Sequence, residues 1–265
     1  MVQIQIMSDL HLEAFKTYDT FVITPEAPYL ALLGNIGSFR HGHRQEYLEF
    51  LERQLFQFKA VFYVLGMHEL AMAAKASKEG EREMGEFVFL DNSRYDFRHE
   101  KVTVLGGTLF SLPRKDHRDS MREYYKDFMR IDGWDANQHF AAHKATCSWL
   151  LHTSTAIENE DPDRAIIILT HYCPSVKKQV LGTSTMYHFA TDRKWLHRFM
   201  TDNVKLWAFG STHNNCDYTD YDNGTRFYSN QRGFPGECED FKISKTVEVG
   251  PIQRYGVVPR RGRSH

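Results

Sequence analysis

Short apolar runs recur along the chain, and most of them are followed at once by glycine or by a polar side chain. Near-continuous apolar runs of roughly four to eight residues are typical of strands that are covered on both faces. We assign seven such runs to strands: Val2–Met7, Tyr29–Leu33, Val61–Leu65, Phe87–Leu90, Val102–Leu105, Ala165–Leu169 and Leu206–Phe209. The pattern therefore predicts a protein rich in buried strands, with polar loops beginning where the strands end.

Stretches with helical spacing separate many of these strands. Gln45–Phe58 repeats apolar side chains every three or four residues and carries charged residues between them, which is the pattern of an amphipathic helix. Asn137–Glu158 predicts a longer helix, and Thr191–Asp202 predicts a third with Thr191 or Asp192 as its N-cap. Alternating strands and helices indicate an α/β fold.

The apolar pattern differs in the last part of the chain. Thr225–Ser229 and Ile243–Val249 alternate apolar and polar residues with a period of two, and no long helix separates them. We therefore expect antiparallel strands of a second sheet here. The segment Leu112–Gln138 combines charged and aromatic residues with weak periodicity, and we expect a lid or an insertion over the pocket.

Composition narrows the class of protein. The 265 residues are enough for one large domain, which we place at residues 1–250, with residues 251–265 as a C-terminal tail. The formal net charge of −1 gives no general attraction to nucleic acid or to an anionic membrane, so we expect neither partner. The four cysteines match no zinc or disulfide framework. We expect no signal peptide, and no apolar run in this sequence approaches the roughly 20 residues that span a bilayer. We expect a cytoplasmic protein with a small-molecule substrate, and the oligomeric state stays open.

Five polar clusters follow the ends of predicted strands. They are Asp9-Leu10-His11, Gly34-Asn35, Gly66-Met67-His68-Glu69, Thr170-His171 and Gly210-Ser211-Thr212-His213. In open α/β sheets, loops at the carboxyl ends of the strands converge and carry the catalytic residues. The pattern therefore predicts one polar pocket rich in histidine.

The order and spacing of these clusters resemble the metallophosphoesterase (calcineurin-like phosphoesterase) family. Its motifs read Asp-x-His, Gly-Asp, Gly-Asn-His-Glu, a lone His and Gly-His-x-His, and the match extends from Asp9 to His213. The resemblance implies a four-layer αββα sandwich in which two mixed β-sheets are flanked by helices. It also implies a pair of metal ions bridged by a carboxylate and a hydroxide.

This sequence departs from the family's motifs at three positions. Asn35 occupies the position of the bridging Asp, Met67 that of the motif Asn, and Ser211 that of the first motif His. By motif position, the second metal would keep His171 as its one strong ligand, whereas a divalent ion normally takes three or four protein donors. We therefore predict that the second metal site is absent.

The first metal position is better preserved. The resemblance assigns Asp9, His11 and His213 to it, and two histidines with one carboxylate form a competent site for a single Fe, Mn or Zn ion. Asn35 could add a neutral carbonyl oxygen, to a metal or to a substrate. Whether the protein uses this one ion or no metal at all is left open by the sequence.

Several residues that are able to transfer protons are present at the motif positions around the altered metal site. His68 matches the family's proton donor to the leaving group, and a buried structural histidine is the equal alternative. Without a second metal, His171 is available as a general acid or base, and Asp9 with His11 forms a further pair. Our leading hypothesis is a repurposed enzyme of isomerase, lyase or cyclase type that acts on a small organic substrate by acid/base catalysis.

Several residues are candidates for substrate binding. Met67 would provide an adaptable apolar wall, and Ser211 a small hydroxyl group. Tyr172 could donate a hydrogen bond, although a packed aromatic is the commoner role. Arg232 could bind a carboxylate or phosphate with two hydrogen bonds, and its segment Ser229–Glu237 resembles a C-terminal motif of one branch of calcineurin-like proteins. A surface salt bridge is an equally good explanation of Arg232.

Two further hypotheses come from other functional classes. The first is a residual metal-dependent phosphoesterase, a hydrolase. The second is a non-catalytic protein that keeps the fold as a ligand-binding platform or scaffold. Metal content would separate the metal-dependent hydrolase from a metal-free pocket.

Overall fold

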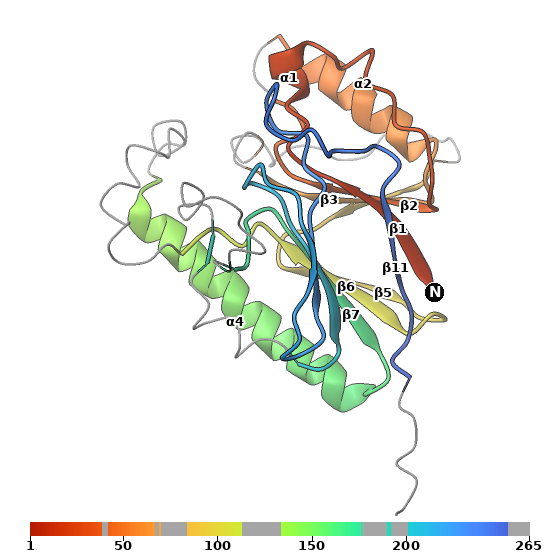
Figure 1. The fold of residues 1–265 in the computed structure, drawn as a ribbon, viewed down its shortest axis with the longest axis vertical. Coiled ribbons are helices and arrows are strands. Elements are labelled where there is room, and N and C mark those ends of the chain that lie inside the picture. Colours follow the sequence, from red (N-terminus) through yellow and green to blue (C-terminus); the bar gives the residue numbers. More distant parts are fainter. Residues whose placement is uncertain are drawn as a thin grey trace, which may run out of the picture.

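The strands form two sheets that pack face to face (Figure 1). The computed structural model describes residues 1–38, 42–66, 69, 84–112, 134–175, 177, 190–191 and 201–253. In strand order, the first sheet contains β11 (Thr246–Val249), β1 (Val2–Met7), β2 (Tyr29–Leu33), β3 (Ala60–Val64) and β4 (Glu86–Phe89). The second contains β5 (Ser93–Phe97), β6 (Val102–Gly107), β7 (Ala165–Thr170), β8 (Val204–Ala208), β10 (Arg226–Tyr228) and β9 (Asp217–Thr219).

Both sheets are mixed, with parallel strands at their centres. β1, β2, β3 and β4 pair in parallel, and β11 runs antiparallel to β1 at the edge. In the second sheet β6, β7, β8 and β10 pair in parallel, while β5 and β9 are antiparallel edge strands. The carboxyl ends of β1, β2 and β3 therefore lie at one edge of the first sheet, and those of β7 and β8 at one edge of the second.

Helices cover the outer faces of the two sheets (Figure 1). α1 (Leu12–Phe15) and α2 (Arg44–Leu55) lie on the first sheet, and α4 (Ala136–Glu160) lies along the second. α4 begins at a capping box, because the Asp135 carboxylate accepts hydrogen bonds from the backbone N–H groups of Asn137 and Gln138. Such a cap typically contributes about 1 kcal/mol to stability.

The strand side chains alternate between two apolar layers. In β7, Ile167 and Leu169 point into the core between the sheets, whereas Ile166 and Ile168 pack toward α4. The strands of the first sheet also point side chains to both faces, and on the outer face these side chains pack in a third apolar cluster with residues of α2. Both faces of the central strands are thus buried, which explains their nearly continuous apolar sequences. The prediction of a four-layer αββα sandwich is confirmed.

The end of the chain is arranged differently from the sequence prediction. Thr225–Ser229 does contain a strand of the second sheet, but this strand, β10, is parallel to β8 and antiparallel to β9. Ile243–Val249 contains β11, which joins the first sheet instead. The prediction that both belong to a second sheet is therefore wrong for β11, because the backbone of β11 pairs with the free edge of β1 in the first sheet.

Some predictions lie outside the described residues. These include most of the expected helix Thr191–Asp202 and residues 113–133 of the expected lid. Residues 136–138 at the end of that segment belong to α4. The division into one domain at 1–250 and a tail at 251–265 stays a prediction.

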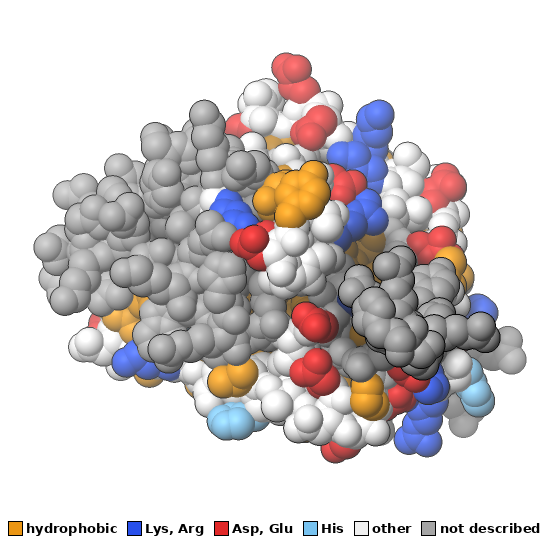
Figure 2. All heavy atoms as spheres, turned by 60° about the horizontal axis from the view of Figure 1, so that its bottom comes forward, with side chains coloured by type: hydrophobic (Ala, Val, Ile, Leu, Met, Phe, Trp, Pro, Cys, Tyr) orange, Lys and Arg blue, Asp and Glu red, His pale blue; other side chains and the backbone are white. Residues whose placement is uncertain are grey.

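The described surface on one side of the molecule carries a mixture of charges. Figure 2 shows acidic and basic side chains interspersed on this face, with apolar side chains scattered among them. This distribution agrees with the formal net charge of −1. Among the described residues, no helix combines the length and apolar character that crossing a membrane requires.

Candidate metal centre

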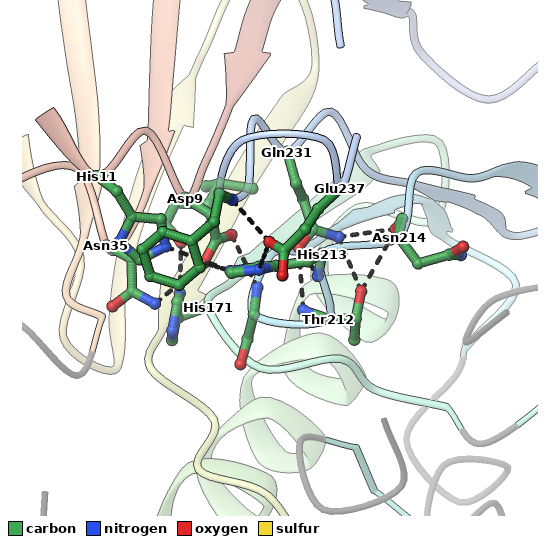
Figure 3. A network of polar contacts seen from close by, with 12 residues as sticks. Asp9, His11, Asn35, His171, Thr212, His213, Asn214, Gln231 and Glu237 are labelled. Carbon is green, nitrogen blue, oxygen red and sulfur yellow. Dashed lines mark hydrogen bonds and ion pairs between the residues drawn. The ribbon is translucent and has the colours of Figure 1, made fainter. Parts of the chain in front are cut away.

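Loops from both sheets meet at one place, and hydrogen bonds between side chains and backbone groups join them. The His171 ring, which follows β7, donates from Nδ1 to the Leu33 carbonyl at the end of β2, at 2.7 Å. The backbone N–H of Ser211, after β8, donates to Asp9 Oδ2, after β1, at 2.9 Å. Figure 3 shows the side chains of Asp9, His11, Asn35, His171 and His213 gathered there. The expected convergence of the strand-end loops is therefore present.

The loops turn sharply to bring these side chains together. Asp9, His11, Asn35, Ser211 and His213 all have positive φ values, between 47° and 70°. Non-glycine residues rarely adopt this left-handed conformation, and such positions concentrate at functional sites, where the surrounding structure holds them. The backbone conformation supports a functional role for this cluster, independently of any motif.

One glycine is required for the loops to approach each other. A Cβ atom on Gly66, after β3, would lie 2.3 Å from the backbone nitrogen of Asn35 and 2.5 Å from its Oδ1. Only glycine fits at that separation. The ends of β2 and β3 can therefore lie in contact beside the site.

Three donor atoms have the spacing of a metal site. His11 Nε2 lies 3.3 Å from His213 Nε2, which lies 3.6 Å from Asp9 Oδ1. One ligand atom from each residue lies within 4.8 Å of the others, and we call Asp9, His11 and His213 the triad. Ligand distances of about 2.0–2.2 Å to a common ion place neighbouring donors roughly 3.0–3.5 Å apart, so the triad fits a divalent ion. Two imidazoles and one carboxylate also match the preferences of Zn, Mn and Fe.

The triad is electrostatically coupled. Burial by itself raises the pKa of Asp9, but its hydrogen bond with His213 and the nearby positive charge of the surrounding histidines hold it well below the usual value. Burial lowers the pKa of His213, but Asp9 and Glu237 outweigh this effect and raise it to about 9. A buried carboxylate anion thus faces a histidine that favours its cationic form. The same charge complementarity would stabilise a metal cation.

Asn35 contacts Asp9 through its amide nitrogen. Its Nδ2 donates to Asp9 Oδ1 at 3.0 Å, and its backbone carbonyl accepts a hydrogen bond from the His11 N–H, also at 3.0 Å. A neutral amide in this position orients Asp9 without adding the second negative charge that a bridging carboxylate would bring. The absence of a second metal site, and substrate binding by Asn35, stay predictions.

Glu69 binds the backbone at the ends of β2 and β3. Its buried carboxylate accepts hydrogen bonds from the backbone nitrogens of Asn35 (3.0 Å), Ile36 (2.6 Å), Gly37 (3.3 Å) and Gly66 (3.0 Å). Several N–H donors can compensate the burial of a carboxylate. Glu69 therefore shapes the loop that carries Asn35.

His171 presents one nitrogen to the site. Because the Leu33 carbonyl can only accept, Nδ1 carries the proton of this hydrogen bond and Nε2 has the lone pair in the neutral ring. His171 is fully buried, and its Nε2 has no hydrogen-bond partner among the described residues. A buried polar atom without a partner is costly, so this nitrogen is suited to a ligand, and the catalytic role of His171 stays a prediction.

The other predicted site residues have diverse environments. Ser211 contributes its backbone N–H to Asp9. Tyr172 is fully buried and packs edge-on against His171, with ring centroids 5.2 Å apart. Met67 and His68 lie outside the described residues. Substrate binding by Ser211, Tyr172 and Met67, and proton transfer by His68, stay predictions.

Arg232 contacts protein groups on the other side of the β1 loop. Its guanidinium lies over the ring of Phe15, 3.8 Å from the centroid, and near Phe21 at 4.9 Å. It also donates a hydrogen bond to the Leu10 carbonyl at 3.2 Å. These contacts support a structural role, in which a stacked cation holds the loop after β1, and substrate binding by Arg232 stays a prediction.

Three residues near the triad had not been expected there. Glu237 Oε2 accepts a hydrogen bond from His213 Nδ1 at 2.5 Å, and the Phe234 ring stacks on His11 with centroids 4.3 Å apart. Gln231 accepts the backbone N–H of His213 at 2.8 Å. All three belong to the segment that had been singled out for Arg232, but no spacing rule connects them to histidines elsewhere in the chain. Only the tertiary fold brings them together.

A surface hollow of about 350 Å³ lies at the opposite ends of the strands. Lys205 and Arg226, at the starts of β8 and β10, and Glu248, near the end of β11, contribute to its lining. None of the triad residues reaches it. The candidate chemistry and this hollow are therefore separate features.

Comparisons with known proteins support the fold. No protein-family model matches the chain. An uncharacterized protein of Acanthamoeba polyphaga mimivirus is 23% identical over 279 residues, covering 94% of this chain and 97% of that protein. The crystal structure of a phosphopantetheinyl hydrolase from Mycobacterium tuberculosis is similar with a TM-score of 0.57 and 16% identity, covering 89% of this chain and 90% of that one. This likeness supports the layered α/β fold alone, and membership of the metallophosphoesterase family stays a prediction.

Proposed function

We propose that this protein is a one-metal enzyme that hydrolyses a phosphate ester of a small organic molecule. The observation that carries the proposal is the convergence of Asp9, His11 and His213, whose donor atoms lie within 4.8 Å of one another. The structurally similar protein from Mycobacterium tuberculosis is a hydrolase of a phosphopantetheinyl group, which favours a phosphate ester as substrate. This ranks the hydrolase above the non-hydrolytic chemistry that the sequence alone had favoured.

The three residues have complementary roles in holding an ion. Asp9 supplies the one negative charge, and hydrogen bonds from Asn35 and Ser211 fix both of its oxygens. His11 and His213 supply neutral nitrogen donors at 3.3 Å from each other. When bound, a divalent ion would supply Lewis-acid polarisation of a substrate oxygen.

His171 is the candidate for proton transfer. Its ring orientation is fixed by the hydrogen bond to Leu33, so its buried Nε2 is held with a lone pair available. In the neutral form this nitrogen can accept a proton from an attacking water, and in the protonated form it can donate one to the leaving group. This assignment uses only the chain's own residues.

A second candidate function rests on the same histidine. A fixed, buried imidazole nitrogen without a partner suits an isomerase, lyase or cyclase that moves a proton within one small molecule. In such an enzyme the product would not contain an added water. Phosphate release therefore separates the two candidates.

The test starts with metal content, measured by mass spectrometry on protein purified without chelator. We expect about one Mn, Fe or Zn per chain, and release of phosphate from phosphomonoesters or phosphodiesters that depends on that metal. His213→Ala should remove both the metal and the activity. His152→Ala is the matched control, because His152 lies on the exposed face of α4.

The outcomes separate the alternatives. Protein without metal, and inactive with added Mn²⁺, Fe²⁺ or Zn²⁺, would overturn the proposed hydrolase. Two ions per chain would contradict the one-metal site. Metal-dependent turnover of a substrate without uptake of water, lost in His171→Ala, would select the acid/base enzyme instead.

A further inference from the structure

The loop that follows β10 passes directly over the triad. Its backbone is fixed to the segment that carries Asp9, because the Arg232 N–H donates to the Ser8 carbonyl at 3.1 Å and the Gly233 N–H to the Asp9 carbonyl at 3.0 Å. Gly233 has φ of 64°, so the chain turns there in a conformation that glycine adopts easily. The following residues, 234–237, are thereby directed toward the two histidines.

One carboxylate oxygen of Glu237 accepts two hydrogen bonds. Its Oε2 accepts a hydrogen bond from His213 Nδ1 at 2.5 Å and another from the backbone N–H of Phe234 at 2.6 Å (Figure 3). A carboxylate can only accept, so the proton lies on Nδ1 and the Nε2 of neutral His213 has the lone pair. That lone pair is directed toward Asp9 and His11, as metal coordination requires.

The Phe234 ring contacts both histidines. It is stacked on His11, with centroids 4.3 Å apart and an angle of 20° between the planes, and it meets His213 edge-on at 5.4 Å. Phe234 is 41% exposed, so this contact with the histidines is made at the surface and not in the apolar core. Its position depends on the backbone hydrogen bond to Glu237.

We propose that Glu237 is a positioning residue of the metal centre, which fixes His213 directly and His11 through Phe234. The proposal rests on the proposed function in that the ligand of the triad is a metal ion. A carboxylate behind a metal-binding histidine fixes its tautomer and ring orientation, and losing it typically weakens metal binding about 10- to 100-fold. An ordinary surface ion pair would leave the tautomer of His213 and the metal affinity unchanged.

The experiment uses full-length protein with histidines labelled with ¹⁵N, and compares Glu237→Ala, Glu237→Gln and wild type. In metal-free protein at a pH where His213 is neutral, the ring-nitrogen shifts report its tautomer. We expect the Nδ1–H form in wild type, a mixture in Glu237→Ala, and recovery in Glu237→Gln, whose amide oxygen can accept both hydrogen bonds. Zn²⁺ affinity, measured by competition with a chelator, should fall about 10- to 100-fold in Glu237→Ala.

Glu239→Gln is the matched control. It removes the same charge from a neighbouring exposed position of the same loop, so it should change neither the tautomer nor the Zn²⁺ affinity. Glu237 is 41% exposed, so its truncation opens no core cavity, and the metal-free variants, like wild type, should still unfold in one cooperative transition.

Two results would overturn the positioning role. One is an unchanged His213 tautomer in Glu237→Ala, and the other is a Zn²⁺ affinity within twofold of wild type. If wild type binds no metal but Glu237→Ala still alters the tautomer, the proposed function fails while the positioning of His213 by Glu237 stands. Failure of the two proposals is therefore distinguishable.

Discussion

Two pairs of histidines, three of them buried and His213 partly buried, have opposite environments in this protein. His11 and His213 face each other across 3.3 Å beside the carboxylate of Asp9. His139 and His143 lie one turn apart on α4 and contact backbone carbonyls: Nε2 of His139 lies 3.1 Å from the Ser111 oxygen, and Nδ1 of His143 lies 2.5 Å from the Phe110 oxygen. The first pair converges on a carboxylate, and the second connects a helix to the loop after β6.

The charges around the two pairs explain the difference. Burial lowers the pKa of His139 to about 3, since the backbone hydrogen bond opposes this only in part and neighbouring His143 lowers it further. His213 is partly buried, which by itself lowers its pKa, but Asp9 and Glu237 outweigh this and raise it to about 9. A buried histidine is therefore a structural residue or a reactive one according to the anions that face it. The predictions that follow test this contrast.

The largest expected effect comes from neutralising the carboxylate. Asp9→Asn keeps the size of the side chain but removes the negative charge between the two histidines. We expect metal affinity to fall at least about 100-fold, because two neutral imidazoles alone form a weak site. Calorimetric titration with Zn²⁺ would measure this. An unchanged affinity would show that Asp9 is not a ligand and would remove the contrast between the two pairs.

The next effect concerns acid stability through His139. Its pKa in the folded protein, about 3, lies below the ordinary value of 6.5, so the unfolded chain takes up a proton first as the pH falls. The stabilisation is complete above pH 6.5 and is lost progressively between pH 6.5 and 3. Over the 2.5 units down to pH 4 this loss is on the order of 3 kcal/mol.

His139→Gln should remove this dependence. Urea unfolding at pH 7, 5.5 and 4.5 should show a smaller loss of stability at low pH than in wild type, even if the variant is less stable at pH 7. His152→Ala, on the exposed face of the same helix, should keep the wild-type slope. Equal slopes in His139→Gln and wild type would show that His139 is not held neutral by burial.

A smaller effect is expected from making the triad more acidic. Asn35→Asp places a second carboxylate where the amide nitrogen now lies, 3.0 Å from Asp9 Oδ1. The two negative charges should lower the stability of the metal-free protein by roughly 1–3 kcal/mol, since a hydrogen bond to a buried charged group is lost. Metal affinity should rise, on the order of tenfold.

Thermal unfolding with and without Zn²⁺ checks both parts of the Asn35→Asp prediction, because a bound ion stabilises the folded state. We expect a lower melting temperature without the ion and a larger increase when it is added. A lower melting temperature under both conditions, with no larger increase, would show that the added carboxylate does not reach the ion.

The smallest effect is expected at the structural pair. The buried thiol of Cys147 lies 3.4 Å from Nε2 of His143, and burial raises its pKa to about 12, so it stays a neutral thiol. Cys147→Ala should cost about 1 kcal/mol of stability and leave metal affinity unchanged. Chemical unfolding together with Zn²⁺ titration tests this. A change in metal affinity would show that the two histidine pairs are coupled.

The residues of the triad could be singled out from the sequence because they lie in short motifs near the ends of apolar strands, and these motifs resemble those of a known family. Each lies directly after an apolar strand, and a run such as Ala165–Leu169 predicts both the strand and the loop that follows. Asp9 and His11 follow β1 of the first sheet and His213 follows β8 of the second, so they lie together only because the two packed sheets bring these strand ends to the same side. The four-layer fold follows from the same apolar runs, since strands covered on both faces need layers on both sides.

The tertiary structure alone decided how the triad is supported. Edge strands β5 and β9 are short and carry exposed polar residues, so their sequences hold little periodic signal. Glu237 lies 24 positions from His213, yet the turn at Gly233 brings its carboxylate to the ring nitrogen. Arg232, in the same segment, contacts Phe15 on the other side. A loop's side chains point where its turns and its hydrogen bonds to distant strands direct them, and neither is encoded in a local pattern of apolar and polar residues.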